Sequence, residues 1–278
     1  MTLPIAHLGW VSAEPMYGEP YESVVVNGEV SFHEQSIDLS TPLQHPEALF
    51  LAVTTEGLIS GGITVSGGIG GYVTSDKVSI FQGDDYPGHH LGAEHRNTLY
   101  VYWSPPLCQI IQYINTESHN LGAELLIRYL GWKINNVGNF HEGKRAVDEW
   151  LTTVGINPYD ITWVDGSGLA RRNLMSPRWV VQLLQVMAQH PYSPYFYESL
   201  AIMGETGTLK NRGINTAIAE QVHAKTGTMS GVSNISGYLQ TKKGHRLVFS
   251  IMSNGTTQYL KQIQETQEQI LKILYDAL

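Results

Sequence analysis

The stretch His223-Ala224-Lys225-Thr226-Gly227-Thr228-Met229-Ser230-Gly231 decides how the rest of the chain is interpreted. Its pattern is typical of an exposed β-strand on which an ammonium group, a hydroxyl group and a glycine follow one another. Lys225 and Thr226 place a cation beside a hydrogen-bond donor, and Gly227 removes a side chain that would block an extended peptide lying along the strand. We therefore predict that this strand forms one wall of a site for a peptide that ends in a carboxylate.

The residues that follow predict the sheet to which this strand belongs. Asn234–Thr241 and Arg246–Met252 both have the composition of strands, and the Lys243-Gly244 pair between them is typical of a hairpin turn. The stretch at 223–231 is therefore expected on a neighbouring strand of an antiparallel sheet.

Segments with the apolar spacing of helices flank these strands. One covers 45–61, and a second is expected to be capped by Ser104 and to run toward Ser118. After a polar junction at 115–120, the apolar pattern resumes up to Gly131. Further helices are expected over Glu142–Leu151, from Ser176-Pro177 to His190, and over Leu260–Leu278. Short β-like runs occupy 1–42.

Composition narrows the possible functions. The 278 residues are 42% hydrophobic, which is ample for a core, and a net charge of −8 without a basic cluster argues against nucleic-acid binding. Cys108 is the only cysteine, so it is expected to pack in the core without a disulfide. Residues 1–10 lack the pattern of a signal peptide, and no transmembrane segment is expected.

Two other patterns predict no site. The loop at 83–97 contains three histidines, but its spacing is not that of a metal-binding helix, so we expect no metal and no cofactor. Ser167 lies in Asp165–Leu169, where the glycines of a hydrolase nucleophile turn are absent, so this segment predicts a structural turn.

Residues 160–260 resemble the low-molecular-weight penicillin-binding proteins, which are serine D-Ala-D-Ala carboxypeptidases and endopeptidases. The Lys-Thr-Gly triplet is one mark of this class, and Ser118-His119-Asn120 matches a second, the Ser-x-Asn triplet. The other matching stretches are Asp165–Leu169, Gly207–Leu209 with Arg212, Ala224–Thr228 and Gly231–Gly237.

The resemblance implies an α/β fold of the α+β kind, in which helices flank an antiparallel sheet as in transpeptidase-like penicillin-binding domains. It assigns residues 96–278 to that domain. Residues 1–95 then form the incomplete remainder of an inserted β-rich accessory domain, with a connecting helix.

The same resemblance implies a role for each site residue. Ser118 would relay a proton to the leaving amine, and Asn120 would hold the substrate amide and orient the lysine. Lys225 would shape the electrostatics around Ser118 and the substrate carboxylate. Thr226 would bind that carboxylate, next to Gly227 in the substrate-binding triplet, and the backbone N–H of Thr228 would help form the oxyanion hole.

A third mark of the class, Ser-x-x-Lys, occurs nowhere in the 278 residues. In this class that serine attacks the D-Ala-D-Ala carbonyl, so without it no acyl-enzyme forms. The nearest pattern, Thr74-Ser75-Asp76-Lys77, lacks the helix start that would place the hydroxyl and the amine on one face. The chain therefore resembles the C-terminal part of a longer enzyme and is expected to be inactive alone.

Three functions remain open from the sequence. The first is an enzyme of this class whose N-terminal part lies outside the sequence, and the second is a non-catalytic protein that binds peptidoglycan peptides. The third is a different serine hydrolase in which Ser118 or Ser167 is paired with a histidine base. The candidate bases are His119, His223 and His245, in no recognisable order.

The resemblance also implies partners and location. The expected partners are peptidoglycan stem peptides that end in D-Ala-D-Ala, and β-lactams if the nucleophile is supplied. The expected location is periplasmic or extracytoplasmic.

Overall fold

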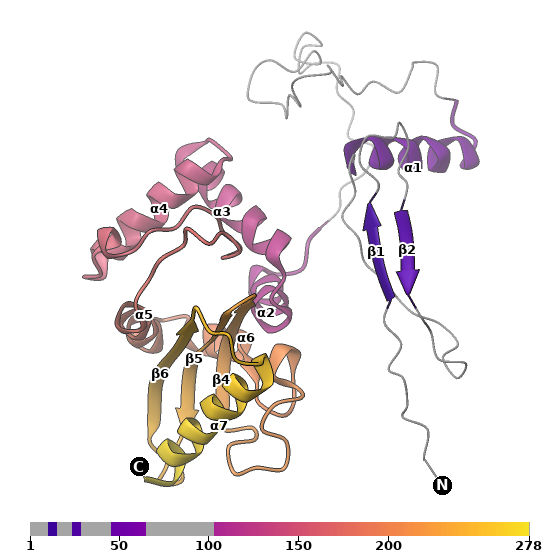
Figure 1. Cartoon of the computed structure of the whole chain (residues 1–278). Coiled ribbons are helices and arrows are strands. Elements are labelled where there is room, and N and C mark those ends of the chain that lie inside the picture. The colour runs from indigo at the N-terminus through magenta and orange to yellow at the C-terminus, as the bar shows by residue number, and fades with distance from the viewer. Residues whose placement is uncertain (1–10, 16–23, 29–45, 65–102, 278) are drawn as a thin grey trace, which may run out of the picture. The chain divides into compact units, whose positions relative to one another are not determined.

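The computed structural model describes residues 11–15, 24–28, 46–64 and 103–277 (Figure 1). The chain divides into two compact units, Met1–Tyr100 and Val101–Leu278, and each is described here by itself. The Thr74–Lys77 pattern and the histidine loop at 83–97 lie outside the described residues.

The first unit contains a hairpin and a helix. Strand β1 (Val11–Pro15) pairs with β2 (Val24–Gly28) in antiparallel fashion, with Val11 opposite Gly28. Helix α1 spans Pro46–Ser60, which confirms the helix predicted there and the proline at its first position.

The second unit is built on a four-stranded antiparallel sheet in the order β3-β4-β5-β6. The sheet confirms the predicted hairpin and places the stretch at 223–231 beside it, with Lys225 opposite Ser236. The strands are β3 (Ala201–Ile202), β4 (Val222–Met229), β5 (Val232–Gln240) and β6 (Arg246–Asn254). Pairing with β3 ends at Ala224, so the edge of β4 from Lys225 onward is unpaired within the described part of the chain.

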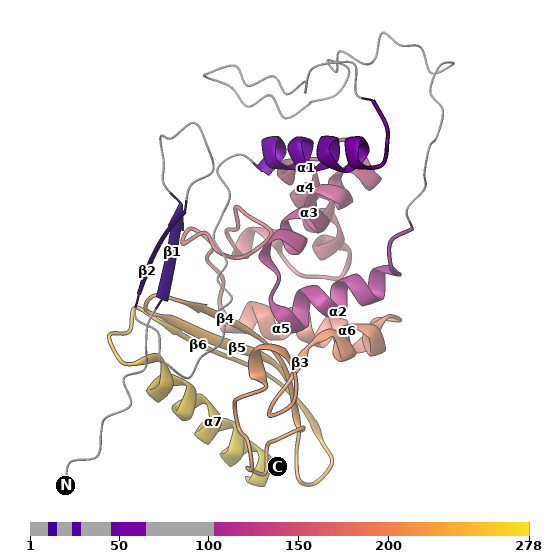
Figure 2. The same cartoon turned by 90° about the vertical axis from the view of Figure 1, so that its right-hand side faces the viewer.

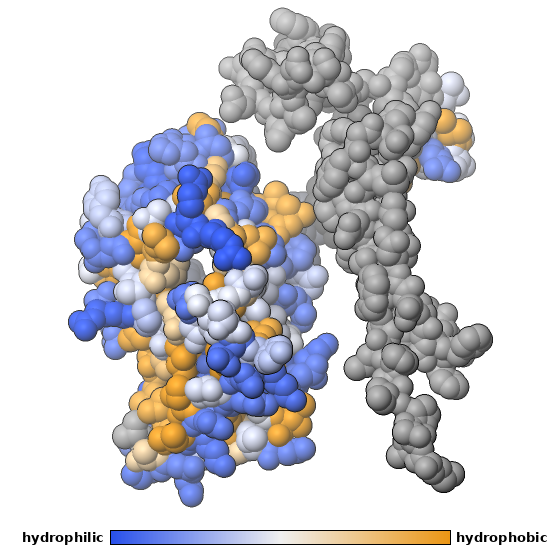
Figure 3. All heavy atoms as spheres, in the orientation of Figure 1, coloured by the Kyte–Doolittle hydropathy of each residue, from blue (hydrophilic) through white to orange (hydrophobic). Residues whose placement is uncertain are grey.

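The two faces of the sheet are covered by different helices (Figure 2). On one face Ile235 and Leu239 are fully buried in a cluster with Leu271 of α7 (Leu260–Ala277). On the other face the Tyr238 hydroxyl donates to the Leu184 carbonyl at 2.7 Å, in α5 (Pro177–Gln189). In Figure 3 a band of hydrophobic surface lies over β6, beside hydrophilic surface over α7.

The remaining helices are α2 (Leu107–Glu117), α3 (Asn120–Asn135), α4 (Phe140–Thr153) and α6 (Ser193–Ser199). Helix α6 packs with α5 against the Tyr238 face of the sheet. The backbones of α3 and α4 come into close contact at Gly143. A Cβ on this residue would lie only 2.0 Å from the Ile127 carbonyl oxygen, so only glycine allows the two helices to approach this closely. The predicted helices at 142–151, 177–190 and 260–278 are confirmed within a few residues at their ends.

Three details of the helix predictions are wrong. Ser104 does not cap α2, whose N-cap is Pro106, because Pro106 has no N–H that the serine could bind. Helix α3 continues past Gly131, because this glycine is a buried packing position where a Cβ would lie 2.7 Å from Gly143 N. Cys108 is half-buried in the first turn of α2 and does not lie in the core.

Part of α3 has an exposed apolar face. Leu121, Leu125 and Trp132 recur at helical spacing, and each is more than half exposed. Among the described helices, none has the length and apolarity needed to cross a bilayer.

Candidate active site

Ser118 lies at the junction between α2 and α3, as the polar sequence at 115–120 predicted. It has a left-handed backbone with φ 56° and ψ 48°, which ends α2. His119 then caps α3, since its Nδ1 accepts a hydrogen bond from Gly122 N at 3.0 Å. Asn120 is the exposed first residue of α3. Ser118 and Asn120 therefore belong to one bend between the two helices.

The end of α2 is held in place by α6 and by a glycine. Thr116 Oγ1 donates to the Ser199 carbonyl at 2.9 Å, and the Asn115 side chain donates to Ser199 Oγ at 2.8 Å. Gly207 has φ +52°, and a Cβ there would lie 2.1 Å from the Thr116 carbonyl oxygen. These contacts fix the backbone two residues before Ser118.

Lys225 reaches Ser118 from β4. Its Nζ donates to Ser118 Oγ at 2.6 Å and to the Thr226 carbonyl at 2.8 Å, and the first bond joins residues that are 107 positions apart. Burial lowers the pKa of Lys225 to about 8. The structure therefore brings Ser118 of the Ser-x-Asn triplet to Lys225 of the Lys-Thr-Gly triplet, whose amine can gain or lose a proton near neutral pH. In the described part of the chain Lys225 has no hydrogen bond to Asn120.

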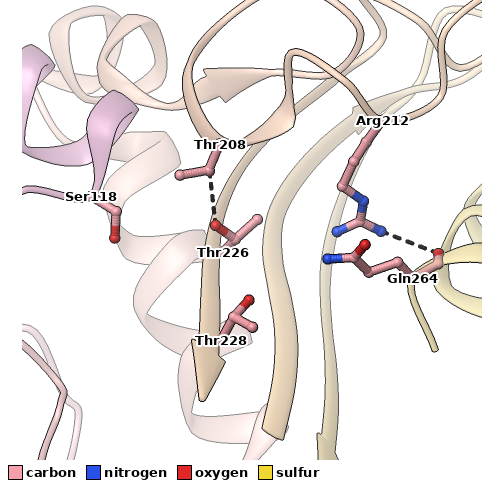
Figure 4. Close-up of a pocket in the computed structure, with 6 residues that line it drawn as sticks. All are labelled: Ser118, Thr208, Arg212, Thr226, Thr228 and Gln264. Carbon is pink, nitrogen blue, oxygen red and sulfur yellow. Dashed lines mark hydrogen bonds between the residues drawn. The ribbon is translucent and has the colours of Figure 1, made fainter. Parts of the chain in front are cut away.

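The threonines of β4 line a pocket of about 190 Å³ next to this pair (Figure 4). Thr226 Oγ1 donates to Thr208 Oγ1 at 2.8 Å. Gly227 is exposed, and its missing side chain leaves the strand open to solvent on that side. The residues that line the pocket are Ser118, Thr208, Arg212, Thr226, Thr228 and Gln264.

Three of these lining residues were not predicted as site residues. Thr208 and Arg212 were included only as part of a matching stretch, and the sequence around Gln264 in the C-terminal helix gave no indication of a site. They reach the pocket through tertiary packing of η5 (Gly207–Leu209), the loop that follows it, and α7.

The segment Asp165–Leu169 is the structural turn that the sequence predicted. The Asp165 carboxylate accepts from Gly168 N and Ala170 N, both at 2.6 Å. Glu124 Oε1, on α3, accepts from Gly166 N at 2.8 Å and Ser167 N at 3.1 Å. These bonds fasten the turn to the helix that begins at the Ser-x-Asn triplet.

No hydrogen bond joins Ser118 or Ser167 to a histidine in the described ranges. His119 is used as a helix cap, and His223 stacks on Tyr197 with a centroid distance of 4.0 Å. Burial lowers the pKa of His223, and its Nδ1 is buried without a hydrogen-bond partner. The arrangement therefore gives no support to a serine–histidine hydrolase. Nor do the described residues bring together three side chains that could hold a metal.

Comparison with known proteins identifies the family. The model of the D-Ala-D-Ala carboxypeptidase 3 (S13) family matches residues 19–275, which includes both triplets and every residue of the pocket. The chain belongs to the S13 family.

Curated relatives of this S13 chain are carboxypeptidases. It is 33% identical over 239 residues to a D-alanyl-D-alanine carboxypeptidase from Actinomadura sp. (strain R39), covering 84% of this chain and 41% of the relative. It is 27% identical over 265 residues to penicillin-sensitive carboxypeptidase A from Dictyostelium discoideum, covering 91% of this chain and 47% of that relative. The chain thus spans less than half the length of these relatives.

A solved penicillin-binding protein has a similar fold over part of this chain. Penicillin-binding protein 4 from Haemophilus influenzae superposes with a TM-score of 0.56 at 29% identity, over 63% of this chain and 40% of that protein. The same protein in complex with a β-lactam gives a TM-score of 0.57 at 27% identity.

Proposed function

We propose that this chain forms the peptide-binding and proton-relay part of a serine D-Ala-D-Ala carboxypeptidase or endopeptidase. The observation that supports this most directly is the 2.6 Å hydrogen bond from Lys225 Nζ to Ser118 Oγ. It unites two of the three motifs that such enzymes use. The proposed substrates are peptidoglycan stem peptides that end in D-Ala-D-Ala, in a periplasmic or other extracytoplasmic compartment.

In the proposed reaction, a serine hydroxyl attacks the carbonyl carbon of the D-Ala-D-Ala amide, and the lysine of Ser-x-x-Lys takes its proton. The C–N bond breaks, and the leaving nitrogen takes a proton from the Ser118 hydroxyl. Lys225 then returns a proton to Ser118, since an amine with a pKa of about 8 still holds one at neutral pH. Water then attacks the ester, one of its protons returns to the serine oxygen as the C–O bond breaks, and the carboxylic acid product is released. The proton on the Ser-x-x-Lys lysine is lost and Lys225 regains one, so that both amines return to their starting states.

The open edge of β4 suits the peptide. Because β3 pairs only as far as Ala224, an extended peptide can lie along the strand from Lys225 onward, as in strand addition. Asn120 would hold the substrate amide, Thr226 would bind the terminal carboxylate and the Thr228 N–H would point at the developing oxyanion.

The nucleophile is proposed to come from a Ser-x-x-Lys segment outside these 278 residues, which contain no such pattern. On this proposal residues 96–278 are the transpeptidase-like domain, and 1–95 are the remainder of an accessory β-rich region with a connecting helix. The same absence supports a second candidate, a protein that binds peptidoglycan peptides reversibly without cleaving them.

Intact mass spectrometry after incubation with penicillin tests the proposal. The chain alone should give no covalent adduct. The chain preceded by an N-terminal part that carries a Ser-x-x-Lys segment should be acylated on the added serine. An adduct on any serine of the chain alone would overturn the assignment of the nucleophile, and failure of the extended protein to react, if it folds, would favour the reversible binder.

A further inference from the structure

One wall of the pocket is a guanidinium group that the roles above leave unused. Arg212 is only 8% exposed. Its Nε donates to Glu268 Oε1 at 2.8 Å, and its Nη2 donates to the Gln264 carbonyl and to Gln267 Oε1, both at 3.2 Å. These bonds fix the plane of the guanidinium group. No hydrogen bond within the described ranges uses Nη1.

Arg212 and the threonines of β4 line the same pocket. Figure 4 shows one nitrogen of Arg212 bonded to the Gln264 carbonyl of α7, and the other on the opposite side of the guanidinium group, beside the Gln264 side chain and on the side of Thr226 and Thr228. The two threonines are two residues apart on a strand, so their side chains leave the same face. An oriented N–H group and two hydroxyl groups thus share one pocket.

The hydroxyl of Thr226 is already paired, but its partner can exchange roles with it. Thr226 Oγ1 donates its single proton to Thr208 Oγ1. If Thr226 turns this proton toward an anion, Thr208 can donate its own proton to the Thr226 oxygen. Both hydroxyls then remain satisfied, and Thr208 orients Thr226 for an acceptor ligand.

We propose that Arg212 Nη1, Thr226 and Thr228 form one binding site for the free carboxylate of the residue that follows the cleaved bond, with Thr208 as a positioning residue. This inference rests on the proposed function and deepens it, because it assigns recognition of the carboxylate to a charged group. A guanidinium held in a fixed plane and largely shielded from water gives a stronger, more directional bond to a carboxylate than a hydroxyl does.

A pair of peptides tests the inference on the whole chain. An N-acylated peptide that ends in D-Ala-D-Ala and the same peptide with a C-terminal carboxamide are titrated by calorimetry or NMR. The acid should bind the unmodified chain about tenfold or more tighter than the amide. Arg212→Gln should remove most of this preference, and Arg212→Lys should restore only part of it. Thr208→Val should weaken binding of the acid peptide and leave binding of the amide peptide unchanged.

Glu268→Gln is the matched control, because it removes the partner of Nε and leaves Nη1 in place. It should keep the preference for the acid. Equal binding of acid and amide to the unmodified chain, or a folded Arg212→Gln that keeps the full preference, would overturn the inference and leave the proposed function standing. Binding of neither peptide would overturn both. If Arg212→Gln fails to fold, the two peptides are compared on the unmodified chain and on Thr208→Val. A preference for the acid that Thr208→Val reduces would support the inference, and an unchanged preference would contradict it.

Discussion

Gly207 and Thr116 touch through their backbones, with no space for a side chain between them. A Cβ on Gly207 would lie 2.1 Å from the Thr116 carbonyl oxygen, and Gly207 also has a left-handed φ of +52°. The contact joins η5, which contains Thr208, to the end of α2, two residues before Ser118. The proposed proton relay and the proposed carboxylate site are therefore positioned by one backbone contact.

Gly207→Ala should lower the free energy of unfolding by about 2–4 kcal/mol. This loss exceeds the strain of a left-handed alanine alone, because the added Cβ also clashes with the Thr116 carbonyl oxygen. Urea unfolding measures this. Gly255→Ala is the control, because Gly255 also has a left-handed φ, +65°, but has no atom within 4 Å of the added Cβ. Equal losses in the two variants would show that the contact with Thr116 contributes nothing.

The Lys225 amine should titrate near pH 8, where its charge is lost as the pH rises, because burial disfavours the ammonium form. Binding of an acyl-D-Ala-D-Ala peptide should therefore weaken as the pH rises through about 8. NMR of the labelled lysine and peptide titrations from pH 6.5 to 9.5 measure both effects. Lys225→Gln should bind weakly at every pH. A flat profile for the unmodified chain would contradict the assignment.

The same lowered pKa has a consequence for stability. Between about pH 8 and pH 10.5 the folded protein has released a proton that the unfolded chain still binds, so Lys225 makes the unfolding free energy rise with pH over this window. The pH dependence of urea unfolding, compared with that of Lys225→Met, isolates this contribution. No difference between the two proteins would mean that the buried amine keeps its ordinary pKa, and a difference of the opposite sign would mean that its pKa is raised; either would contradict the prediction.

Lys225→Ala and Thr226→Val, made in the version extended with the Ser-x-x-Lys part, should slow β-lactam acylation about 10- to 100-fold without unfolding the protein. Thr226 lines the pocket, Lys225 donates a hydrogen bond to Ser118, which also lines it, and neither residue belongs to the hydrophobic cluster around Leu271. A fluorescent penicillin measures the rate. Unchanged rates in both variants would remove these residues from the site.

Glu124→Ala should lower the free energy of unfolding by about 1–3 kcal/mol, because the N–H groups of Gly166 and Ser167 lose their hydrogen-bond acceptor. Burial tends to raise the pKa of Glu124, but bonds from Arg128 and these two N–H groups outweigh it, so its pKa lies below the ordinary 4.5. Its stabilisation is therefore present above pH 4.5 and disappears as the pH falls through the lowered value. Thermal unfolding measures the loss. Glu149→Ala, in an exposed ion pair, should change little, and an equal effect there would refute the role of the turn.

The parts of the fold that depend on local pattern could be predicted from the sequence. The β4 strand and the β5–β6 hairpin follow from strand composition and a turn, and the α2–α3 junction follows from a polar break between two apolar helical runs. The sequence could not predict that Gly131 packs against another helix instead of ending α3, because that contact joins residues on separate helices. For the same reason Arg212 and Gln264 could not be predicted as pocket residues, because tertiary packing brings them there from distant parts of the chain.

The unpaired edge of β4 has an effect beyond substrate binding. A strand that can accept a peptide can also accept the same strand of a second molecule, and exposed edges are where β-proteins aggregate. Lys225 begins this edge, and lysine is one of the residues by which natural edge strands resist such pairing. Replacing it with a β-branched apolar residue should therefore make the protein self-associate, which sedimentation would detect.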